Sequence, residues 1–464
     1  MIYGRDKKLR VALVLSPCWT NLSPPLGISY LASISKLRGY ETRCFDINIE
    51  IYNLLKQEKI DFWDFGAHYK WQDPFFSDQV LPLIKGYLKS KVDEIIAFAP
   101  DIIGFTIFYT NALASLYLAK EIKKLDSRKT ILFGGPECYG EASSFNFLNS
   151  GSVDLIVIGE GEQTFEELVD YYEKNNAITS IDGTLIKKNG TIIKGGFRSE
   201  IEDLDSIPLP DFKDFSLKSY KNFALPILTS RGCVGRCAFC GEIRYWKNFR
   251  FRSAQNIIEE LKQGVDCYNV REFFFNDSLI NGNLPELSKL IDLIIENNLN
   301  IAWGGYARVN KFMSLDMLKR LRKAGCYFLS YGIESGSEKI LRDMNKQISL
   351  NDAKINLENT VKAQIQTHVN WIVGFPTESW IDFLKSFIFI YKNRKNIYHF
   401  NPGQRPCAIP HDSDLATNPK KFKIAEKPFL NNWRSLCFRN TIIHRQLRLE
   451  ILRLWISFLR IGHS

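Results

Sequence analysis

Three cysteines stand close together in the middle of the chain, at Cys233, Cys237 and Cys240. Their C-x3-C-x2-C spacing supplies three thiolates, which can hold three irons of a cubane cluster and leave the fourth iron open to a substrate. Two arginines of the same loop, Arg231 and Arg236, can offset the negative charge of such a cluster. Zinc is the alternative, although a structural zinc site has four ligands and no histidine lies near the loop.

The cysteine loop follows the first member of a series of alternating strand and helix patterns. Short apolar runs predict strands at 226–229, 272–275, 301–303, 327–332, 367–373 and 398–400. Helical patterns between these runs open near Ser253, Leu284, Ser314, Glu338, Asn351 and Ser379. Six such units predict an open, partial (β/α)6 barrel, in which functional side chains gather where the strands end.

The first ~195 residues show the same alternation, which predicts a Rossmann-like α/β domain. The predicted strands are 11–15, 42–45, 102–106, 130–133 and 155–158, and a hairpin turns at Asn189-Gly190. Residues 61–78 follow no period, so we expect an irregular insertion there. Glycine turns end two of the strands, at Gly134-Gly135-Pro136 and at Gly159-Glu160-Gly161-Glu162.

Composition and charge limit the possible partners. Hydrophobic residues make up 45% of the 464, and no apolar run approaches the ~18 residues that cross a bilayer. We read the basic start and the short apolar run after it as a first strand, so we expect a cytoplasmic protein with reduced cysteines. Most of the net charge of +10 lies in the tail, because the chain from Lys420 onward has ten Lys and Arg and two Glu. A nucleic-acid binder usually spreads its basic residues more widely, so we expect no nucleic acid.

The cysteine loop, with Phe239 before the third cysteine, resembles the motif of the radical S-adenosylmethionine (SAM) enzymes. The stretches 331–337, 344–346 and 371–378 resemble the later barrel of their cobalamin-dependent branch, and 24–32, 101–106, 133–137 and 159–162 resemble its cobalamin-binding domain. The resemblance implies a cobalamin-binding domain over 1–198, a linker over 199–222, a radical SAM partial barrel over 223–403 and a helical C-terminal extension over 404–464.

The resemblance also implies roles for residues at the barrel's strand ends. Cys233, Cys237 and Cys240 would hold a [4Fe–4S] cluster whose open iron binds SAM. Glu334 and Ser335 would bind the ribose hydroxyls, although Glu334 is also suited to capping a helix. Asp277, with Asn276, and Arg308 would reach the methionine part or the substrate, unless they only shape turns. Gly374 and Pro376 would let the chain approach the adenine.

In the N-terminal domain, the resemblance implies a cobalamin lying against the glycine turns. The residues expected to bind it are Thr106, Gly134, Gly135, Pro136, Gly159, Glu160, Gly161 and Glu162. The Asp-x-His-x-x-Gly motif, whose histidine ligates cobalt in many cobalamin proteins, does not occur, and the domain's one histidine is His68. We therefore expect cobalt without a histidine ligand.

By resemblance, the activity is C-methylation of an unactivated carbon in a specialised metabolite or its precursor. One SAM would remethylate reduced cobalt, and a second would supply the radical. The alternative is rearrangement or cyclisation without methyl transfer; a mere cobalamin or redox sensor is a third, less favoured class. An electron donor such as flavodoxin or ferredoxin would be a partner.

Several residues keep two interpretations. His368 is either a core histidine or a base, and Cys407 is either a core residue or a substrate contact; the cysteines at 18, 44, 138, 267, 326 and 437 read as small apolar residues. In the tail, Leu447, Ile451, Leu454, Trp455 and Phe458 form a stripe among arginines. A helix there either meets a membrane surface weakly or packs on the barrel. Because Leu449, Leu452, Ile456 and Leu459 widen the apolar surface, we favour packing.

Overall fold

The computed structural model describes residues 8–58, 60, 62–410, 413–425, 433–436 and 440–461. The chain divides into two compact units, Met1–Pro226 and Ile227–Ser464. Cys437 lies outside the described residues.

The first unit is built on a sheet of order β2-β1-β3-β4-β5-β6-β7. Its strands are β1 (Arg10–Leu15), β2 (Glu41–Asp46), β3 (Ile102–Thr106), β4 (Thr130–Gly134), β5 (Leu155–Val157), β6 (Thr184–Lys188) and β7 (Thr191–Lys194). The strands β1 to β5 pair in parallel, and the hairpin β6–β7 joins them antiparallel. This order places a topological switch point between β1 and β3, where ligands of such sheets bind.

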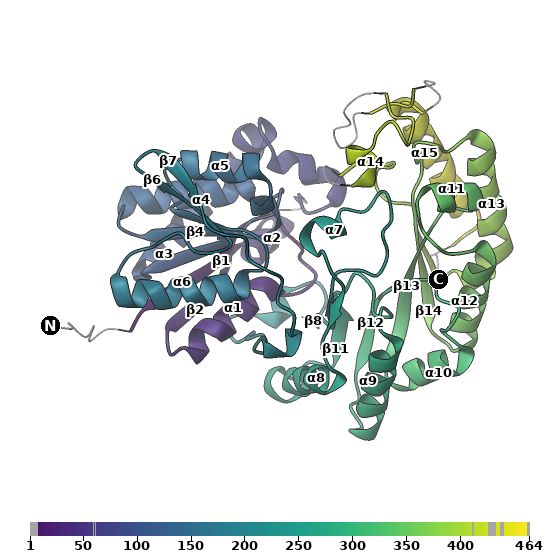
Figure 1. The fold of residues 1–464 in the computed structure, drawn as a ribbon, viewed down its shortest axis with the longest axis horizontal. Coiled ribbons are helices and arrows are strands. Elements are labelled where there is room, and N and C mark those ends of the chain that lie inside the picture. The colour runs from purple at the N-terminus through teal and green to yellow at the C-terminus, as the bar shows by residue number, and fades with distance from the viewer. Residues whose placement is uncertain are drawn as a thin grey trace. The chain divides into compact units, whose positions relative to one another are not determined.

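Helices cover both faces of this sheet (Figure 1). They are α1 (Leu26–Leu37), α2 (Ile47–Gln57), α3 (Leu81–Ala97), α4 (Ala112–Leu125), α5 (Glu141–Asn149) and α6 (Gly161–Asn175), with the short turn η3 at Pro136–Tyr139. The segment expected as a linker holds the turns η4 (Leu204–Ser206) and η5 (Leu217–Ser219). Its side chains Ile201, Leu204 and Ile207 pack on Tyr30 of this unit.

The expectation of an irregular insertion over 61–78 is only partly correct. Phe65–Trp71 forms a 3-10 helix, η1, and Phe76–Val80 forms a π-helical turn, η2, that runs into α3. The rings of Trp63 and Trp71 lie 5.2 Å apart, and Trp71 is fully buried. Aromatic packing orders this segment, and such packing leaves no helical period in the sequence.

The second unit contains a sheet of order β15-β14-β13-β12-β11-β8, and it is the predicted partial barrel. Its strands are β8 (Ala224–Ile227), β11 (Glu272–Phe275), β12 (Ala302–Ala307), β13 (Cys326–Glu334), β14 (Gln366–Trp371) and β15 (His399–Asn401). β11 to β15 pair in parallel. A small ribbon pairs β9 (Ser230–Arg231) with β10 (Arg250–Phe251).

Helices cover the outer side of this sheet (Figure 1). They are α8 (Ala254–Tyr268), α9 (Leu284–Glu296), α10 (Leu315–Lys323), α11 (Glu338–Asp343), α12 (Leu350–Lys362) and α13 (Trp380–Asn393). Two short elements complete the unit: α7 (Glu242–Tyr245) after the cysteine loop and η6 (Arg394–Asn396) after α13. α8, α9, α10, α12 and α13 each begin at a Ser or Asn whose side chain accepts a backbone N–H of the first turn. These caps explain why each helix starts where the sequence predicts it.

The C-terminal region adds α14 (Asp414–Thr417) and α15 (Ile442–Phe458). α15 packs on the second unit, as favoured above, and buries Leu449, Leu452 and Ile456. The stripe singled out in the sequence does not provide the buried face, because Leu447, Leu454 and Phe458 are exposed. Among the described residues, we find no helix with the length and apolar character to cross a membrane.

Candidate functional site

The cysteine loop lies between β9 and α7, at the carboxyl end of β8. The backbone N–H of Gly235 donates to Cys233 Sγ at 3.3 Å, and that of Glu242 donates to Cys240 Sγ at 3.5 Å. Burial raises the pKa of the Cys240 thiol to about 11. Among the described residues, no three His, Cys, Asp or Glu side chains converge on one ion position. Three free cysteines on one loop are the donor set of a cubane, which binds each thiolate through a different iron, so the residues present fit the cluster.

The loop is held in place by the segment that follows β13. Ala238 N donates to Met344 O at 2.8 Å, and Asn345 Nδ2 donates to Arg236 O at 2.8 Å. Because these bonds lie on either side of Cys237, the middle cysteine is fixed relative to the barrel's fourth strand.

Asp277, which follows β11, is buried beneath the start of the cysteine loop. Its carboxylate accepts from Thr229 Oγ1 at 2.8 Å, from Ser230 Oγ at 2.6 Å and from Thr229 N at 3.2 Å. Burial raises the pKa of this carboxyl to about 6. These contacts show that Asp277 fixes the strand end from which the cysteine loop departs; its neighbour Asn276 donates its N–H to Ile227 O.

Arg308, which follows β12, lies against the cysteine loop. Its backbone is clamped by Asn281, whose side chain accepts from Arg308 N at 2.9 Å and donates to Arg308 O at 2.8 Å. Its guanidinium donates to Lys346 O, and a Cβ atom at Gly235 would lie only 2.4 Å from Arg308 Nη1. The structure thus brings Arg308 and the cysteine loop together.

Glu334 and Lys346 form a buried ion pair near Phe239, the residue before Cys240. The strand β13 shifts register between Gly332 and Glu334, and Glu334 takes a positive φ of 72°. Lys346 Nζ lies 2.9 Å from Glu334 Oε1 and 5.6 Å from the centroid of the Phe239 ring. Sequence reasoning assigned no role to Lys346; the signal was its place at the end of the Met344-Asn345-Lys346 stretch.

The turns after β13 and β14 hold the remaining predicted SAM residues, and the C-terminal helix α15 clamps the second of these turns. Ser335 is fully buried at the turn after β13, where its Oγ accepts from Ser337 N. After β14, Gly374 has a φ of 81°, and its N–H donates to Glu378 Oε2 at 2.9 Å. Arg448 of α15 lies 3.3 Å from the same carboxylate oxygen, and both side chains are buried.

Two further contacts close this clamp. Asn440 Nδ2 donates to Phe375 O at 2.8 Å, next to Pro376. Arg445 donates to Trp433 O at 2.9 Å, and its stem occupies the space where a Cβ of Gly374 would be. The clamp thus fixes the loop expected to meet the adenine, and no motif in the sequence indicated that tail arginines would reach this loop.

The inner face of the barrel carries polar and aromatic side chains. Asn401 Nδ2 donates to Asn370 Oδ1 at 3.1 Å, and Asn370 Nδ2 donates to Ser330 Oγ at 2.9 Å. His368, two residues before Asn370 in β14, stacks on Phe328, with ring centroids 4.7 Å apart. Burial, with the neighbouring His399, lowers the pKa of His368 to about 4, so this imidazole is neutral.

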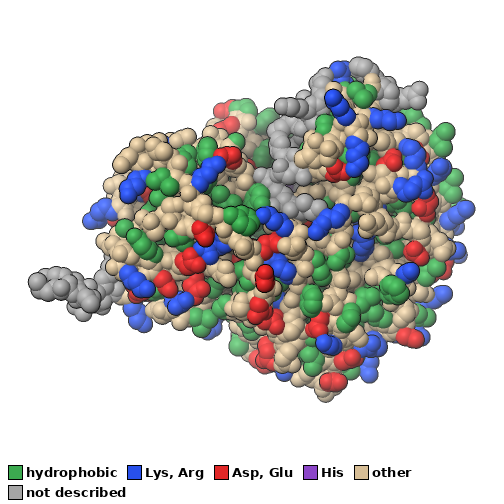
Figure 2. Space-filling view, in the orientation of Figure 1, with side chains coloured by type: hydrophobic (Ala, Val, Ile, Leu, Met, Phe, Trp, Pro, Cys, Tyr) green, Lys and Arg blue, Asp and Glu red, His purple; other side chains and the backbone are tan. Residues whose placement is uncertain are grey.

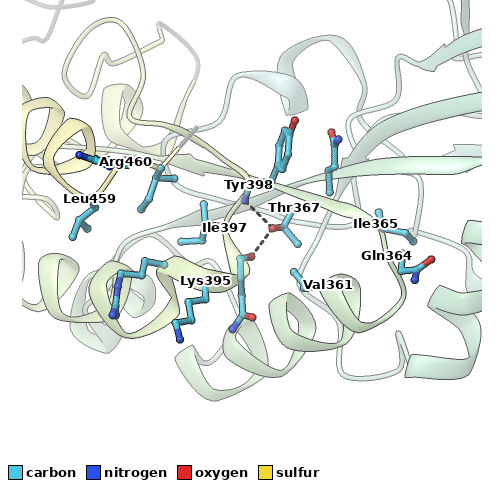
Figure 3. Close-up of a pocket in the computed structure, with 13 residues that line it drawn as sticks. Val361, Gln364, Ile365, Thr367, Lys395, Ile397, Tyr398, Leu459 and Arg460 are labelled. Carbon is cyan, nitrogen blue, oxygen red and sulfur yellow. Dashed lines mark hydrogen bonds between the residues drawn. The ribbon is translucent and has the colours of Figure 1, made fainter. Parts of the chain in front are cut away.

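A cavity of about 370 Å³ lies at the opposite, amino end of β14 and β15 (Figure 3). Gln364, Thr367 and Tyr398 line it, and Lys395 and Arg460 point away from each other there. None of the predicted site residues lines this cavity, so it is separate from the cysteine loop.

In the first unit, the predicted cobalamin residues lie at the carboxyl ends of three neighbouring strands. Thr106 ends β3, Gly134 ends β4 with Gly135 and Pro136 after it, and Gly159 to Glu162 follow β5. A Cβ at Gly159 or Gly161 would meet nothing within 4 Å. A flat ligand can therefore approach the backbone there, which fits a corrin.

Two of these residues have structural partners. Gly135, with a φ of 103°, packs on Ile107, because a Cβ would lie 2.8 Å from Ile107 O. Glu160 Oε2 accepts from Ile201 N at 2.6 Å. His68 lies in η1, away from these strand ends in the sequence.

Sequence reasoning missed the residues at the switch point itself. Asn111 Nδ2 donates to Thr106 O at 2.9 Å and to Ser16 O at 3.3 Å, which ties the ends of β3 and β1 together. The rings of Trp19 and Phe108 stack with centroids 3.4 Å apart, and Tyr109 is exposed beside them in the sequence. Polar and aromatic residues directly after the two strands were the available signal.

The cysteines outside the loop differ in burial. Cys18, Cys44, Cys138, Cys326 and Cys407 are buried, as expected of small apolar residues, and Cys407 N donates to Val373 O. Cys267 is exposed, so the apolar interpretation is wrong there: it lies in the last turn of α8, on the solvent side.

Two protein-family models match the chain. The model of the radical SAM superfamily matches residues 227–390, and the model of the B12-binding domain matches residues 84–169. The two matches fall in the second and the first unit, respectively.

Relatives and solved structures agree with these matches. "Uncharacterized methyltransferase PH0819" of Pyrococcus horikoshii is 27% identical, covering 96% of this chain and 94% of that protein. The cytidylyl-2-hydroxyethylphosphonate methyltransferase of Streptomyces wedmorensis is 22% identical, covering 76% of this chain and 69% of that protein.

Two solved structures share the fold. TsrM from Kitasatospora setae, a radical SAM methyltransferase with cobalamin and a [4Fe–4S] cluster bound, aligns with a TM-score of 0.67 at 15% identity, covering 88% of this chain and 74% of that one. OxsB, a cobalamin-dependent SAM radical enzyme, aligns with a TM-score of 0.71 at 16% identity, covering 97% of this chain and 67% of that one. A radical SAM domain uses a [4Fe–4S] cluster and SAM, and a B12-binding domain uses cobalamin. The chain therefore belongs to the cobalamin-dependent radical SAM enzymes.

Proposed function

We propose that this enzyme methylates an unactivated carbon of a specialised metabolite or its precursor. The observation that carries the proposal is the three-cysteine loop, which fits a cluster with one open iron, in a chain that also has a B12-binding domain. When bound, the cluster supplies the electron that cleaves SAM, and cobalamin supplies a carrier for the methyl group. The methyltransferase names of two relatives support the same activity.

The residues around the cysteine loop would bind and orient SAM. Cys233, Cys237 and Cys240 would hold the cluster. Glu334 would accept hydrogen bonds from the ribose diol, while Lys346 offsets its charge at 2.9 Å. Arg308, beside Gly235, is suited to the methionine carboxylate, because a guanidinium matches a carboxylate in shape and charge. Asp277 would act by holding the strand end, since its oxygens already accept three bonds.

The inner face of the barrel suggests what part of the substrate reaches the site. Ser330, Asn370 and Asn401 offer a neutral hydrogen-bonding row, and the neutral His368 continues it. These groups support a substrate whose reacting part is uncharged and polar. His368 would contact substrate as a neutral acceptor, and Cys407, which is buried, would have only a packing role.

The cobalamin would lie on the first unit, over 1–198, with Thr106 and the two glycine turns against the corrin. No histidine is placed to ligate the cobalt by the usual motif. Without a histidine ligand from the protein, cobalt would be easier to reduce, which suits a methyl carrier that takes its methyl group from SAM. A flavodoxin or ferredoxin would supply the electrons.

Rearrangement or cyclisation without methyl transfer is the second candidate. The anaerobic magnesium-protoporphyrin IX monomethyl ester cyclase of Cereibacter sphaeroides is 28% identical over 239 residues, which is 49% of this chain and 39% of that enzyme. That enzyme's name describes ring closure, so the two activities occur among this chain's relatives.

Anaerobic assays with labelled SAM separate the two candidates. The reconstituted protein with cobalamin and reductant is mixed with a small-molecule extract, and SAM carries a deuterated methyl group. Methylation yields S-adenosylhomocysteine together with 5′-deoxyadenosine and a product bearing the label. Extract-dependent 5′-deoxyadenosine without S-adenosylhomocysteine would contradict methylation and favour the second candidate.

A further inference from the structure

Helices α13 and α15 lie next to each other on the outside of the second unit. The ring of Trp455 in α15 lies 5.6 Å from that of Phe387 and 6.5 Å from that of Tyr391, both in α13. α15 turns Arg445 and Arg448 inward together with Leu449, Leu452 and Ile456. One face of α15 therefore packs on the second unit, and this packing does not explain why the opposite face is apolar.

That opposite face is apolar on both helices. On α13, Ile381 is 69% exposed, and Leu384, Ile388 and Tyr391 continue the same face at helical spacing. On α15, Ile443 and Leu454 are each 72% exposed and Phe458 is 76% exposed, with Leu447 between them. We call these eight side chains the α13–α15 face. Large apolar side chains gathered like this mark an interaction site rather than ordinary surface.

Positive charge surrounds the α13–α15 face. Lys385 and Lys392 flank the apolar stripe on α13, and Lys395 follows in η6. Arg460 follows the end of α15, and Arg453 lies in the second half of that helix, where it donates to Glu450, Gly403 O and Gln404 O. Over residues 380–396 and 440–461 the sequence has two acidic residues, of which Asp382 is buried and Glu450 pairs with Arg453 at 2.6 Å. Figure 2 shows Lys and Arg side chains next to hydrophobic ones along the edge where α13 lies.

We propose that the α13–α15 face docks on the surface of an anionic lipid membrane. Two helices lying side by side with apolar residues outward and cations along their edges have the form of an in-plane membrane anchor. The lysines and arginines would meet anionic headgroups, and Tyr391 and the partly exposed Trp455 suit the interface between headgroups and acyl chains. The surplus of exposed cations complements anionic lipid better than it complements a second copy of the same positive face.

Vesicle flotation with the full-length reconstituted protein tests this proposal. We expect binding to vesicles of phosphatidylcholine with phosphatidylglycerol, and much weaker binding to phosphatidylcholine alone. The double variant Leu454→Ser/Phe458→Ser should reduce the partition coefficient about tenfold or more, because it removes apolar contact with the acyl region. Lys385→Glu/Lys392→Glu should reduce it by at least roughly fivefold for each lysine.

Matched controls come from the first unit. Leu37→Ser replaces a side chain that is 71% exposed, and Lys124→Glu reverses an exposed charge; both should leave vesicle binding unchanged. The thermal midpoints of the four proteins should agree, since all substituted side chains are exposed. Absence of binding to anionic vesicles, or equal loss in the controls, would overturn the proposal. A concentration-dependent dimer abolished by Leu454→Ser/Phe458→Ser would overturn it too and identify a second copy as the occupant.

Discussion

Lys346 Nζ lies 2.9 Å from Glu334 Oε1, and both side chains are buried at the end of β13. The same lysine is near the ring of Phe239, and its carbonyl oxygen accepts from Arg308. One residue thus connects the cysteine loop, the third strand and the fourth strand of the barrel. This connection brings together the cysteine loop, the ends of β12 and β13, and the 344–346 stretch, which form the candidate site.

Replacing one member of this pair should harm the protein more than replacing both. Lys346→Met leaves Glu334 buried without a partner, so we expect the free energy of unfolding to fall by about 3 kcal/mol. Glu334→Gln/Lys346→Met should recover much of that loss, whereas SAM binding should stay weakened in both variants. Chemical denaturation and equilibrium dialysis measure the two effects. Equal stability of the single and double variants would show that the pair is not coupled.

The cysteine triplet should account for all of the bound iron. Anaerobic reconstitution should give about four irons per chain, and Cys→Ala at 233, 237 or 240 should abolish reductive cleavage of SAM. Cys267→Ala is the matched control, because this exposed cysteine lies outside the loop. Cleavage that persists in the triple variant would refute the assignment.

Arg448 should stabilise the protein far more than Arg453 of the same helix. The Arg448–Glu378 pair is buried, so Arg448→Met should cost about 3 to 5 kcal/mol of unfolding free energy. Arg453 is partly exposed, pairs with the exposed Glu450 and donates to Gly403 O and Gln404 O, so Arg453→Met should cost less, about 1 to 2 kcal/mol. Thermal or urea unfolding distinguishes these values. Similar losses for both variants would show that the clamp on the Gly374 loop contributes little.

His368 should make stability depend on pH in mild acid. Burial lowers its pKa from an ordinary 6.5 to about 4, so the unfolded chain binds the proton more readily than the folded one. The stability it contributes is present above pH 6.5 and is lost as the pH falls from there toward 4. The fall in thermal midpoint between pH 7 and pH 5 should therefore be smaller in His368→Gln. An unchanged pH dependence would contradict a neutral buried imidazole.

The cobalt should have no histidine ligand from the protein. Electron paramagnetic resonance of the Co(II) form should lack nitrogen superhyperfine splitting, and His68→Ala should leave the spectrum unchanged. Splitting that disappears in the His68 variant would show that this histidine reaches the cobalt.

The sequence alone was sufficient for the chemistry that depends on local spacing. The triplet of Cys233, Cys237 and Cys240 lies within eight residues, so its spacing alone is enough to propose that the three thiolates bind one cluster. The alternation of strands and helices in both units also followed from alternating apolar runs, whereas the order of the strands within each sheet came from the structure. The glycine turns could likewise be placed at strand ends.

Tertiary structure alone decided which distant side chains meet and which faces are buried. Lys346 reaches Glu334 because a register shift in β13 turns that carboxylate inward. In α15, apolar residues occur around the helix, so periodicity could not tell the inner face from the outer. The buried carboxylate of Glu378 requires a cation, and this requirement turns Arg448 inward and leaves Leu454 and Phe458 facing solvent.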